Sequence, residues 1–208
     1  GEKRLEELLP FLLIAASKTS QPCLALERSL WLIEAVLRRT AYLVLLKENP
    51  PALEQLVKLG AASPWVAELL AKMPILLDEL LTPSQLYIQL SKPSLEQDLA
   101  QQLAHISWQD TEAQMEALRY FHHATLLRLA AADLLAQRPL MQVSDSLTFM
   151  AEVILQQVLN LAWQDLAQRH GAPVLANGQT ASLENPGFVI LGYGKLGGLE
   201  LSYASDLD

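Results

Sequence analysis

Cysteine is nearly absent from this 208-residue chain, in which Cys23 is the only one. A disulfide within the chain and a zinc site built from several cysteines are therefore excluded, and a reducing, cytoplasmic location is consistent with this composition. Long apolar runs are missing too, because no stretch reaches the roughly 18 uninterrupted apolar residues of a membrane-spanning helix. The run from Leu8 to Ala16 contains Pro10 and lacks a clean cleavage site, so we expect neither a signal peptide nor a membrane segment.

Positive charge and aromatic side chains are also scarce. The formal net charge is −8, and aromatic residues make up 6% of the chain. Proteins that bind nucleic acids usually carry a basic patch or stripe, and none is visible in this sequence. We therefore expect no nucleic-acid partner. A nucleotide remains compatible with an acidic chain, because metal ions neutralise phosphates locally.

The residues that are abundant favour helices. Hydrophobic residues make up 51% of the chain, and leucine and alanine dominate among them. Apolar positions recur at helical spacing in several segments, which prolines, glycines and capping side chains separate. We expect helices over residues 24–47, 51–59 (ended by Gly60), 64–73 (capped by Ser63), 75–81, 94–105 (a capping box of Ser94 and Gln97), 111–137 (ended by Pro139) and 145–170 (capped by Gly171). The fold class is therefore mainly α, with a helical bundle over residues 1–170.

The composition changes after residue 170. Residues 171–187 are rich in Gly, Pro, Asn and Ser, which predicts a linker loop, and Asn177-Gly178 is typical of a tight turn within it. Phe188 to Leu191 form a short, partly β-branched apolar run. This run is the first credible buried strand of the chain.

Glycines gather directly after the predicted strand, in a segment that also holds one lysine. These residues are Gly192, Gly194, Lys195, Gly197 and Gly198. Glycine lets the backbone approach a phosphate closely enough for N–H groups to donate to it, and the lysine adds a positive charge. The segment is therefore a candidate phosphate-binding loop.

Two acidic residues follow this loop at a spacing of two. If the chain is extended there, Asp206 and Asp208 point to the same face and lie about 7 Å apart along the strand. Divalent cations with hard oxygen ligands relieve the repulsion between such carboxylates, and Mg²⁺ is the usual ion where phosphates share the site. The combination suits attack on a nucleotide α-phosphate with pyrophosphate leaving.

Simpler interpretations exist for each of these features. Gly192-x-Gly194-x-x-Gly197 after a strand also matches the dinucleotide-binding fingerprint, although 170 helical residues before it fit that fold poorly. The two aspartates are alternatively solvated acids at a strand end, and Lys195 an exposed loop lysine. His122 and His123 are adjacent, so they do not form the i, i+4 pair of a helical metal site.

A strand, a Gly-Gly loop and Asp-x-Asp in this order resemble the polymerase-β-like nucleotidyltransferase superfamily. The longer string of residues 192–201 (GYGKLGGLEL), followed by Ser205-Asp-Leu-Asp208, resembles the glutamine synthetase adenylyltransferase/adenylyl-removing family more specifically. Motifs of the helical part, such as residues 37–43 (LRRTAYL) and 127–133 (LRLAAAD), resemble the same family. Its members have two homologous halves: one attaches AMP from ATP to a tyrosine of glutamine synthetase, and the other removes it by phosphorolysis.

The resemblance implies a role for individual residues, with the adenylyltransferase half favoured over the removing half. It implies that Asp206 and Asp208 are catalytic and bind Mg²⁺, and that ATP is the substrate. The residues implied to bind the nucleotide are Gly192, Gly194, Lys195, Gly197, Gly198 and Ser205. Glutamine synthetase and a PII-type regulatory protein are the implied partners.

The resemblance also implies that the core is incomplete in this chain. The family uses a third carboxylate on a later strand, which the sequence does not contain, so we expect residues 188–208 to be only the first strands of an α/β nucleotidyltransferase core. The fragment alone should then be inactive. Two alternatives stay open: the removing half of such an enzyme, and a helical interaction module without catalysis.

Overall fold

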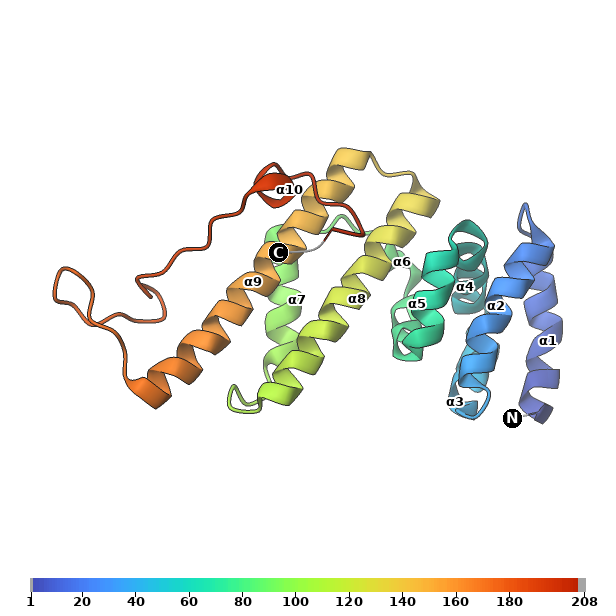
Figure 1. The fold of residues 1–208 in the computed structure, drawn as a ribbon. Helices are drawn as coiled ribbons and strands as arrows, with labels where there is room; N and C mark the ends of the chain where they lie inside the picture. Colours follow the sequence, from blue (N-terminus) through green and yellow to red (C-terminus); the bar gives the residue numbers. More distant parts are fainter. Residues whose placement is uncertain (1, 206–208) are drawn as a thin grey trace. The chain divides into compact units, whose positions relative to one another are not determined.

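The computed structural model describes residues 2–205, apart from the side chains of Pro83 and Gln85 (Figure 1). Helices make up most of this part of the chain and no strand occurs within it, so the mainly α prediction is confirmed. A single antiparallel bridge between Val174 and Thr180 is the β-type pairing found there.

Short helices fill the first half of the chain and long ones follow (Figure 1). They are α1 (Glu2–Ser17), α2 (Pro22–Val36), α3 (Thr40–Glu48), α4 (Pro50–Ala62), α5 (Pro64–Lys72), the 3₁₀ helix η1 (Pro74–Leu81), α6 (Pro83–Leu86), α7 (Lys92–Leu103), α8 (Thr111–Ala136), α9 (Leu140–His170) and the single turn α10 (Gly194–Gly197). None of the helices in residues 2–205 combines the length and the apolarity that crossing a bilayer requires.

The contacts divide the chain into two compact units, which we call unit 1 and unit 2. Unit 1 comprises the residues up to Gln89 together with Ala124–Pro139. Unit 2 comprises Leu90–His123 and the residues from Leu140 onward. The boundary between His123 and Ala124 falls inside the continuous helix α8, so the first half of this helix belongs to unit 2 and its second half to unit 1.

Unit 1 is a bundle of short helices around a leucine-rich core. Helix α2 packs against α4 and α5, and α1 packs against α3 and α4. Each helix contributes leucines that are almost completely buried, among them Leu8, Leu12, Leu32, Leu46, Leu56 and Leu70. Burial of one such side chain contributes about 1.5–3 kcal/mol. The core therefore holds helices that are too short to be stable alone.

The helix predicted over residues 24–47 is wrong, because the chain turns between α2 and α3. The amide of Leu37 donates to the carbonyl of Glu34, and that of Arg39 donates to Val36, in a tight turn that ends α2. No proline or glycine signals this turn. Its effect is to let α3 bury Leu43 and Leu46 in unit 1. Tertiary packing thus overrides the helical propensity of the local sequence.

Gly60 was expected to end its helix, but α4 continues to Ala62 and the glycine lies buried within it. The end of α4 is held from the neighbouring helix instead. Arg28 of α2 donates from one guanidinium nitrogen to the carbonyls of Gly60 and Ala61, at 3.0 Å each. These carbonyls would otherwise lack partners at the helix terminus. The arginine therefore replaces the glycine cap that the sequence indicated.

Replacement of Gly60 by alanine is expected to stabilise the chain. A Cβ at this position would lie 3.8 Å from Cβ of Arg28 and 3.9 Å from Oγ of Ser29, which is ordinary van der Waals contact. Alanine favours a helix interior over glycine by about 0.5–1 kcal/mol. Thermal unfolding followed by circular dichroism should show a midpoint that is higher by a few degrees.

A matched control is Gly171→Ala, because Gly171 has φ +80° and no atom lies within 4 Å of an added Cβ there. Alanine there must adopt the left-handed conformation, which costs roughly 1 kcal/mol, so the midpoint should fall. A midpoint lowered by Gly60→Ala would contradict the first expectation and would show that α2 and α4 need the missing side chain.

The caps of two helices test the sequence interpretation directly. Ser63 caps α5 as predicted, since its hydroxyl accepts the amide of Val66 at 3.4 Å. The capping box at Ser94 is wrong, because α7 begins at Lys92 and Ser91 is its cap. The Ser91 hydroxyl accepts the Ser94 amide, and the Ser94 hydroxyl accepts the Ser91 amide. Ser91, three residues before Ser94, is thus the N-cap of the box, and Ser94 takes the third helical position that was expected of Gln97.

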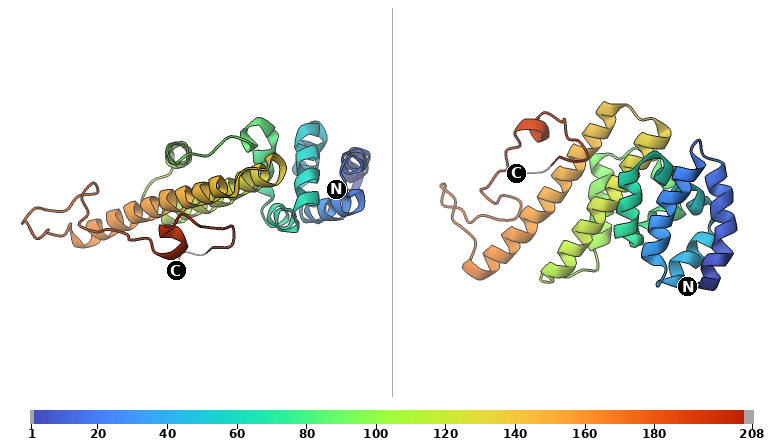
Figure 2. Two further views of the ribbon diagram at one scale, coloured as in Figure 1. Left: turned by 90° about the horizontal axis from the view of Figure 1, so that it is seen from above. Right: turned by 45° about the vertical axis from the view of Figure 1, so that its right-hand side comes forward.

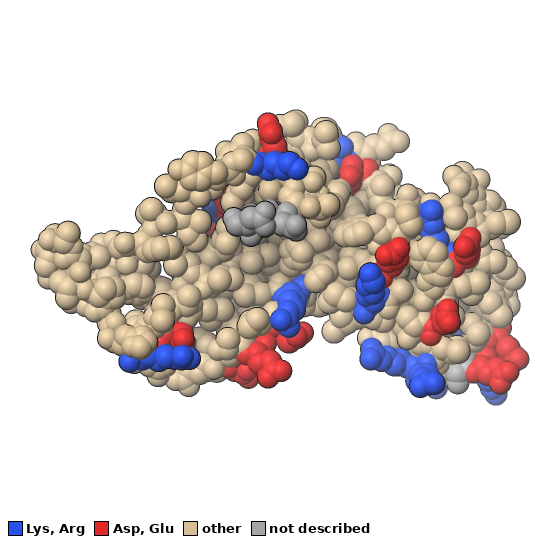
Figure 3. Space-filling model, viewed as in Figure 1, with Lys and Arg blue, Asp and Glu red and all other residues tan. Residues whose placement is uncertain are grey.

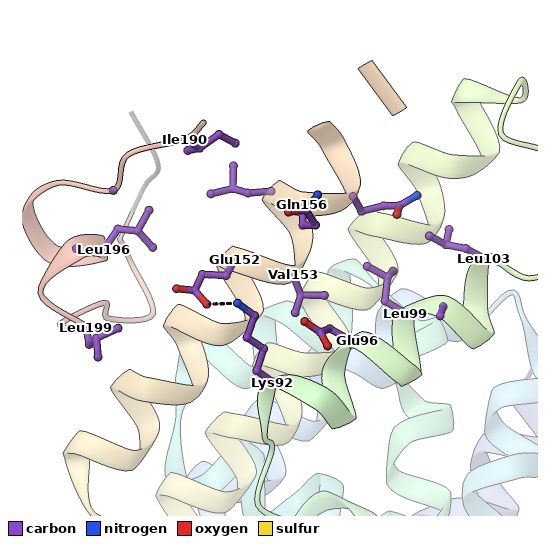
Figure 4. Close-up of a pocket in the computed structure, with 15 residues that line it drawn as sticks. Lys92, Glu96, Leu99, Leu103, Glu152, Val153, Gln156, Ile190, Leu196 and Leu199 are labelled. Atoms are coloured by element: carbon purple, nitrogen blue, oxygen red, sulfur yellow. Dashed lines mark hydrogen bonds and ion pairs between the residues drawn. The ribbon is translucent and has the colours of Figure 1, made fainter. Parts of the chain in front are cut away.

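Unit 2 is organised around α9, against which α7 packs. Helix α8 ends before Pro139 as expected, but α9 begins at Leu140 rather than at Asp145. The end of α9 is as predicted: Gly171 has φ +80° and its amide donates to the carbonyl of Ala167. The views in Figures 2 and 4 place α9 between α7 and the glycine-rich segment that follows.

Candidate functional site

Residues 171–187 form a loop, as predicted, with one tight turn. The amide of Leu175 donates to the carbonyl of Gln179, and the amide of Gly178 donates back to Leu175. Gly178 has φ +81°, and the Asn177 side chain accepts the Gln179 amide. The predicted turn at Asn177-Gly178 is therefore confirmed.

The buried strand expected at residues 188–191 is not present. The chain is irregular there, and its side chains are exposed: Phe188 by 59%, Val189 by 74%, Ile190 by 48% and Leu191 by 69%. A strand needs a neighbouring strand to accept its backbone hydrogen bonds, and residues 2–205 contain none. The four apolar side chains are therefore exposed in this structure.

The glycine-rich segment 192–198 closes into a compact turn around α10. The Gly197 amide donates to the carbonyl of Tyr193, the Gly198 amide to Gly194, and the Glu200 amide to Lys195. The amide N–H groups of Gly197 and Gly198 are thus bonded inside the turn. Their role in this structure is to allow close packing of the backbone.

Two of these glycines are required for different physical reasons. A Cβ on Gly197 would lie 2.4 Å from the carbonyl oxygen of Gly192 and 3.1 Å from its carbon, both backbone atoms that cannot move aside. Gly194 has open space around it but φ +58°, a conformation that favours glycine. Segment 192–197 therefore depends on one glycine for space and on another for conformation.

Ser205 shapes a second turn directly before the acidic pair. Its hydroxyl oxygen accepts the amide of Ser202 at 2.9 Å and lies 3.0 Å from the Ser202 hydroxyl. Its own amide donates to the carbonyl of Ser202 at 3.0 Å. The serine thus closes a hydrogen-bonded turn of four residues, which directly precedes Asp206 in the sequence.

Three residues that the sequence singled out line the same cavity. A hollow of about 570 Å³ is bordered by Gly192, Lys195 and Ser205, with Leu155 of α9 and Leu201 among its apolar walls. The Lys195 side chain is exposed. Residues of three kinds thus border one cavity: a lysine, a glycine and a serine. Gly194 and Gly198 lie in the same turn but do not border this cavity.

A second cavity, of about 550 Å³, lies on α9 next to the first (Figure 4). Ile190, Leu196 and Leu199 border it on the side of the glycine-rich segment, and Leu99 and Leu103 of α7 on the other (Figure 4). Lys92 of α7 reaches Glu152 of α9 with a separation of 2.8 Å between nitrogen and oxygen. The ion pair is half exposed, so its contribution to stability is small.

The sequence did not indicate Ser144, which connects α9 to the glycine-rich segment. Its hydroxyl points to the carbonyl oxygens of Leu199 at 3.0 Å and Leu201 at 2.8 Å. Ser144 is buried, and so is the Leu201 side chain. The segment between the glycines and the acidic pair is therefore attached to the helical part of unit 2.

Asp206 and Asp208, the predicted catalytic and metal-binding residues, lie outside the described residues. Within residues 2–205, no group of three His, Cys, Asp or Glu side chains is arranged to hold a metal ion. The rings of His122 and His123 contact each other edge to face, with centroids 5.0 Å apart. Burial, and then the neighbouring His123, lower the pKa of His122 below its usual 6.5.

Acidic and basic side chains alternate over the surface drawn in Figure 3, where the basic ones form no continuous stripe. Several of them are paired, such as Lys18 with Glu54 and Lys47 with Glu7, both at 2.6 Å. These pairs place opposite charges side by side on the surface of the described residues.

Comparison with known proteins gives consistent similarities over the whole chain. A sequence profile of the family described as glutamate-ammonia ligase adenylyltransferase matches residues 53–208. The bifunctional glutamine synthetase adenylyltransferase/adenylyl-removing enzyme of Pseudomonas putida is 52% identical over 208 residues, 100% of this chain. Proteins of the same name from Nitrosococcus oceani and Thioalkalivibrio sulfidiphilus are 51% and 47% identical, over 99% and 100% of the chain. The chain spans 21% of the length of each of these three relatives.

Proposed function

Because this chain belongs to the glutamate-ammonia ligase adenylyltransferase family, we propose that it is part of an enzyme that transfers AMP from ATP to a tyrosine of glutamine synthetase. The observation that carries the proposal is the family match over residues 53–208, which includes the glycine-rich segment and the acidic pair. The enzyme would thereby regulate nitrogen assimilation in the cytoplasm, with a PII-type protein as its regulator.

The proposed domain organisation follows the change in composition along the chain. Residues 1–170 form the helical region, 171–187 the linker, and 188–208 the start of the nucleotidyltransferase core. In the longer protein, the exposed side chains of residues 188–191 would be covered when this segment pairs with further strands of the core. In this proposal the third carboxylate of the family lies on one of those strands, and residues 1–208 alone would be inactive.

The residue types in and after the glycine-rich segment are suited to binding a nucleoside triphosphate with magnesium. Lys195, Gly192 and Ser205 border one cavity, and Asp206 follows Ser205 directly in the sequence. Asp206 and Asp208 would hold Mg²⁺, which when bound stabilises negative charge on phosphate oxygens. Lys195 would attract the phosphates, and the side chains missing from Gly197 and Gly198 would leave the backbone turn narrow beside them. The Ser202–Ser205 turn would orient the acidic pair.

Removal of AMP by phosphorolysis is the second candidate function. It is supported by the names of the similar proteins, which are called adenylyltransferase/adenylyl-removing enzymes. Both reactions need the same elements, a phosphate-binding loop and acids that hold metal ions. The family resemblance over nearly the whole chain favours the transferase.

The test is an assay of the full-length protein with ATP labelled in its α-phosphate. We expect label to appear on glutamine synthetase together with release of pyrophosphate. Incubation of adenylylated glutamine synthetase with orthophosphate separates the second candidate, because phosphorolysis releases AMP as ADP. To assign the reaction to this chain, Asp206→Asn must remove the first activity and leave the second. The opposite result would assign this chain to the removing half, and loss of neither would reject both candidates.

A further inference from the structure

One buried hydroxyl joins the helical part of unit 2 to the segment that precedes the acidic pair. Oγ of Ser144 in α9 lies 3.0 Å from the carbonyl oxygen of Leu199 and 2.8 Å from that of Leu201. A hydroxyl has one proton, so it is shared between the two acceptors. The two carbonyls are thereby held at a defined distance from the axis of α9.

The backbone at this point adopts a conformation that needs such support. Leu199 has φ +57°, in the left-handed region that leucine rarely occupies. Strained conformations of this kind persist only where the surroundings hold them. The Leu199 side chain is 41% exposed and so provides little of that support, whereas Leu201 is buried and its carbonyl is bound by Ser144.

The held segment leads to the acidic pair without a break. Ser202 follows Leu201, and the Ser202–Ser205 turn brings the chain to Asp206. On the other side of Leu199 lies the glycine turn, joined to Glu200 by the hydrogen bond from the Glu200 amide to Lys195. Ser144 therefore binds the backbone between the glycine-rich turn and the Ser202–Ser205 turn.

We propose that Ser144 is a positioning residue for nucleotidyl transfer, which fixes the backbone of Leu199 and Leu201 between the glycine-rich loop and the Ser202–Ser205 turn. This inference rests on the proposed function. It assigns to the helical region a part in the chemistry beyond that of a spacer. A misplacement of about 1 Å in a reacting group costs up to about 100-fold in rate, so loss of this contact is felt in catalysis more than in binding of the protein substrate.

Ser146 is a matched control on the same helix. Its hydroxyl is also buried and also bonds to two carbonyl oxygens, those of Gln142 at 2.9 Å and Leu90 at 3.3 Å. Neither acceptor belongs to the glycine-rich segment or to the acidic pair. Loss of either hydroxyl should therefore disturb the folding of unit 2 to a similar extent, and only loss of Ser144 should disturb the reaction.

The experiment compares Ser144→Ala and Ser146→Ala in the full-length protein, by the rate of AMP transfer to glutamine synthetase and by thermal unfolding. We expect Ser144→Ala to lower kcat about tenfold, with KM for glutamine synthetase changed less than about twofold. Ser146→Ala should lower the melting temperature similarly but keep kcat near that of the wild type. Ser144→Cys, which keeps the size of the side chain but donates more weakly, should give an intermediate kcat.

Equal kcat values for the two alanine variants would overturn the proposal, as would a loss in Ser144→Ala that appears only in KM. If Ser144→Ala does not fold, Ser144→Cys compared with Ser146→Cys decides the question by the same criterion. Failure of the proposed function itself looks different, because the wild type would then transfer no AMP, or Asp206→Asn would transfer it normally.

Discussion

Asp206→Asn in the full-length protein is expected to abolish AMP transfer to glutamine synthetase, with a fall in kcat/KM of about 10³-fold or more. The substitution keeps the size of the side chain and removes one negative charge. Residues 187–208 contain three carboxylates, those of Glu200, Asp206 and Asp208. Of these, Asp206 and Asp208 have the spacing of two expected of a pair that holds Mg²⁺ beside the phosphates. An amide is a much weaker ligand for Mg²⁺ than a carboxylate, so the nucleotide would lose its compensating charge.

Asp165→Asn is the control for this variant. Asp165 lies on α9 and is half-exposed, with its carboxylate 2.7 Å from Arg169 one helical turn away. The substitution Asp165→Asn makes the same chemical change as Asp206→Asn, but it removes only a surface ion pair. Such a pair contributes about 0.3–0.5 kcal/mol to stability. Steady-state assays of both variants should show loss in Asp206→Asn alone. Transfer in Asp206→Asn at the rate of the control would remove the aspartate from the proposed site.

The elements of the fold that sequence analysis located correctly are those with a local chemical cause. Ser63 before a proline caps α5, and Gly171 in the left-handed conformation ends α9. The turn between α2 and α3 was missed because its cause is the burial of Leu43 and Leu46 by distant helices. Likewise, Gly60 indicated a helix end, but the guanidinium group of Arg28 on another helix caps the carbonyls there.

The family resemblance drawn from the motif was confirmed by the comparisons, since short strings of glycines and acids carry much information about chemistry. The geometry of the motif was less accessible. The apolar run at residues 188–191 fits a strand, yet strands depend on partners that residues 2–205 do not supply. Ser144 gave no signal at all, because a single serine in a helix shows no pattern, and its acceptors lie 55 and 57 residues further along the chain.

Gly197→Ala is expected to reduce AMP transfer about 100-fold or more without unfolding the helical region. The added Cβ would stand 2.4 Å from the carbonyl oxygen of Gly192, a distance that real Cβ atoms essentially never show. The carbonyl group of Gly192 belongs to the backbone, so it cannot rotate away as a side chain would. The turn between Gly192 and residue 197 therefore has to open. The cavity that Gly192 shares with Lys195 and Ser205 would change shape, and KM for ATP should rise as kcat falls.

Two other glycine variants separate this steric effect from a general sensitivity of the loops. Gly178→Ala places a methyl group in open space at φ +81°, in the linker turn, and should leave transfer near the wild-type rate. Gly194→Ala also meets no atom within 4 Å, but strains the backbone at φ +58°, so its loss should lie between the other two. An alanine at residue 197 that is tolerated as well as one at residue 178 would mean that the contact with Gly192 is not kept during catalysis. The compact turn would then be a form of the loop that exists only without ATP. If the contact is kept while ATP is bound, the loss of AMP transfer must be largest for Gly197→Ala, smaller for Gly194→Ala and smallest for Gly178→Ala.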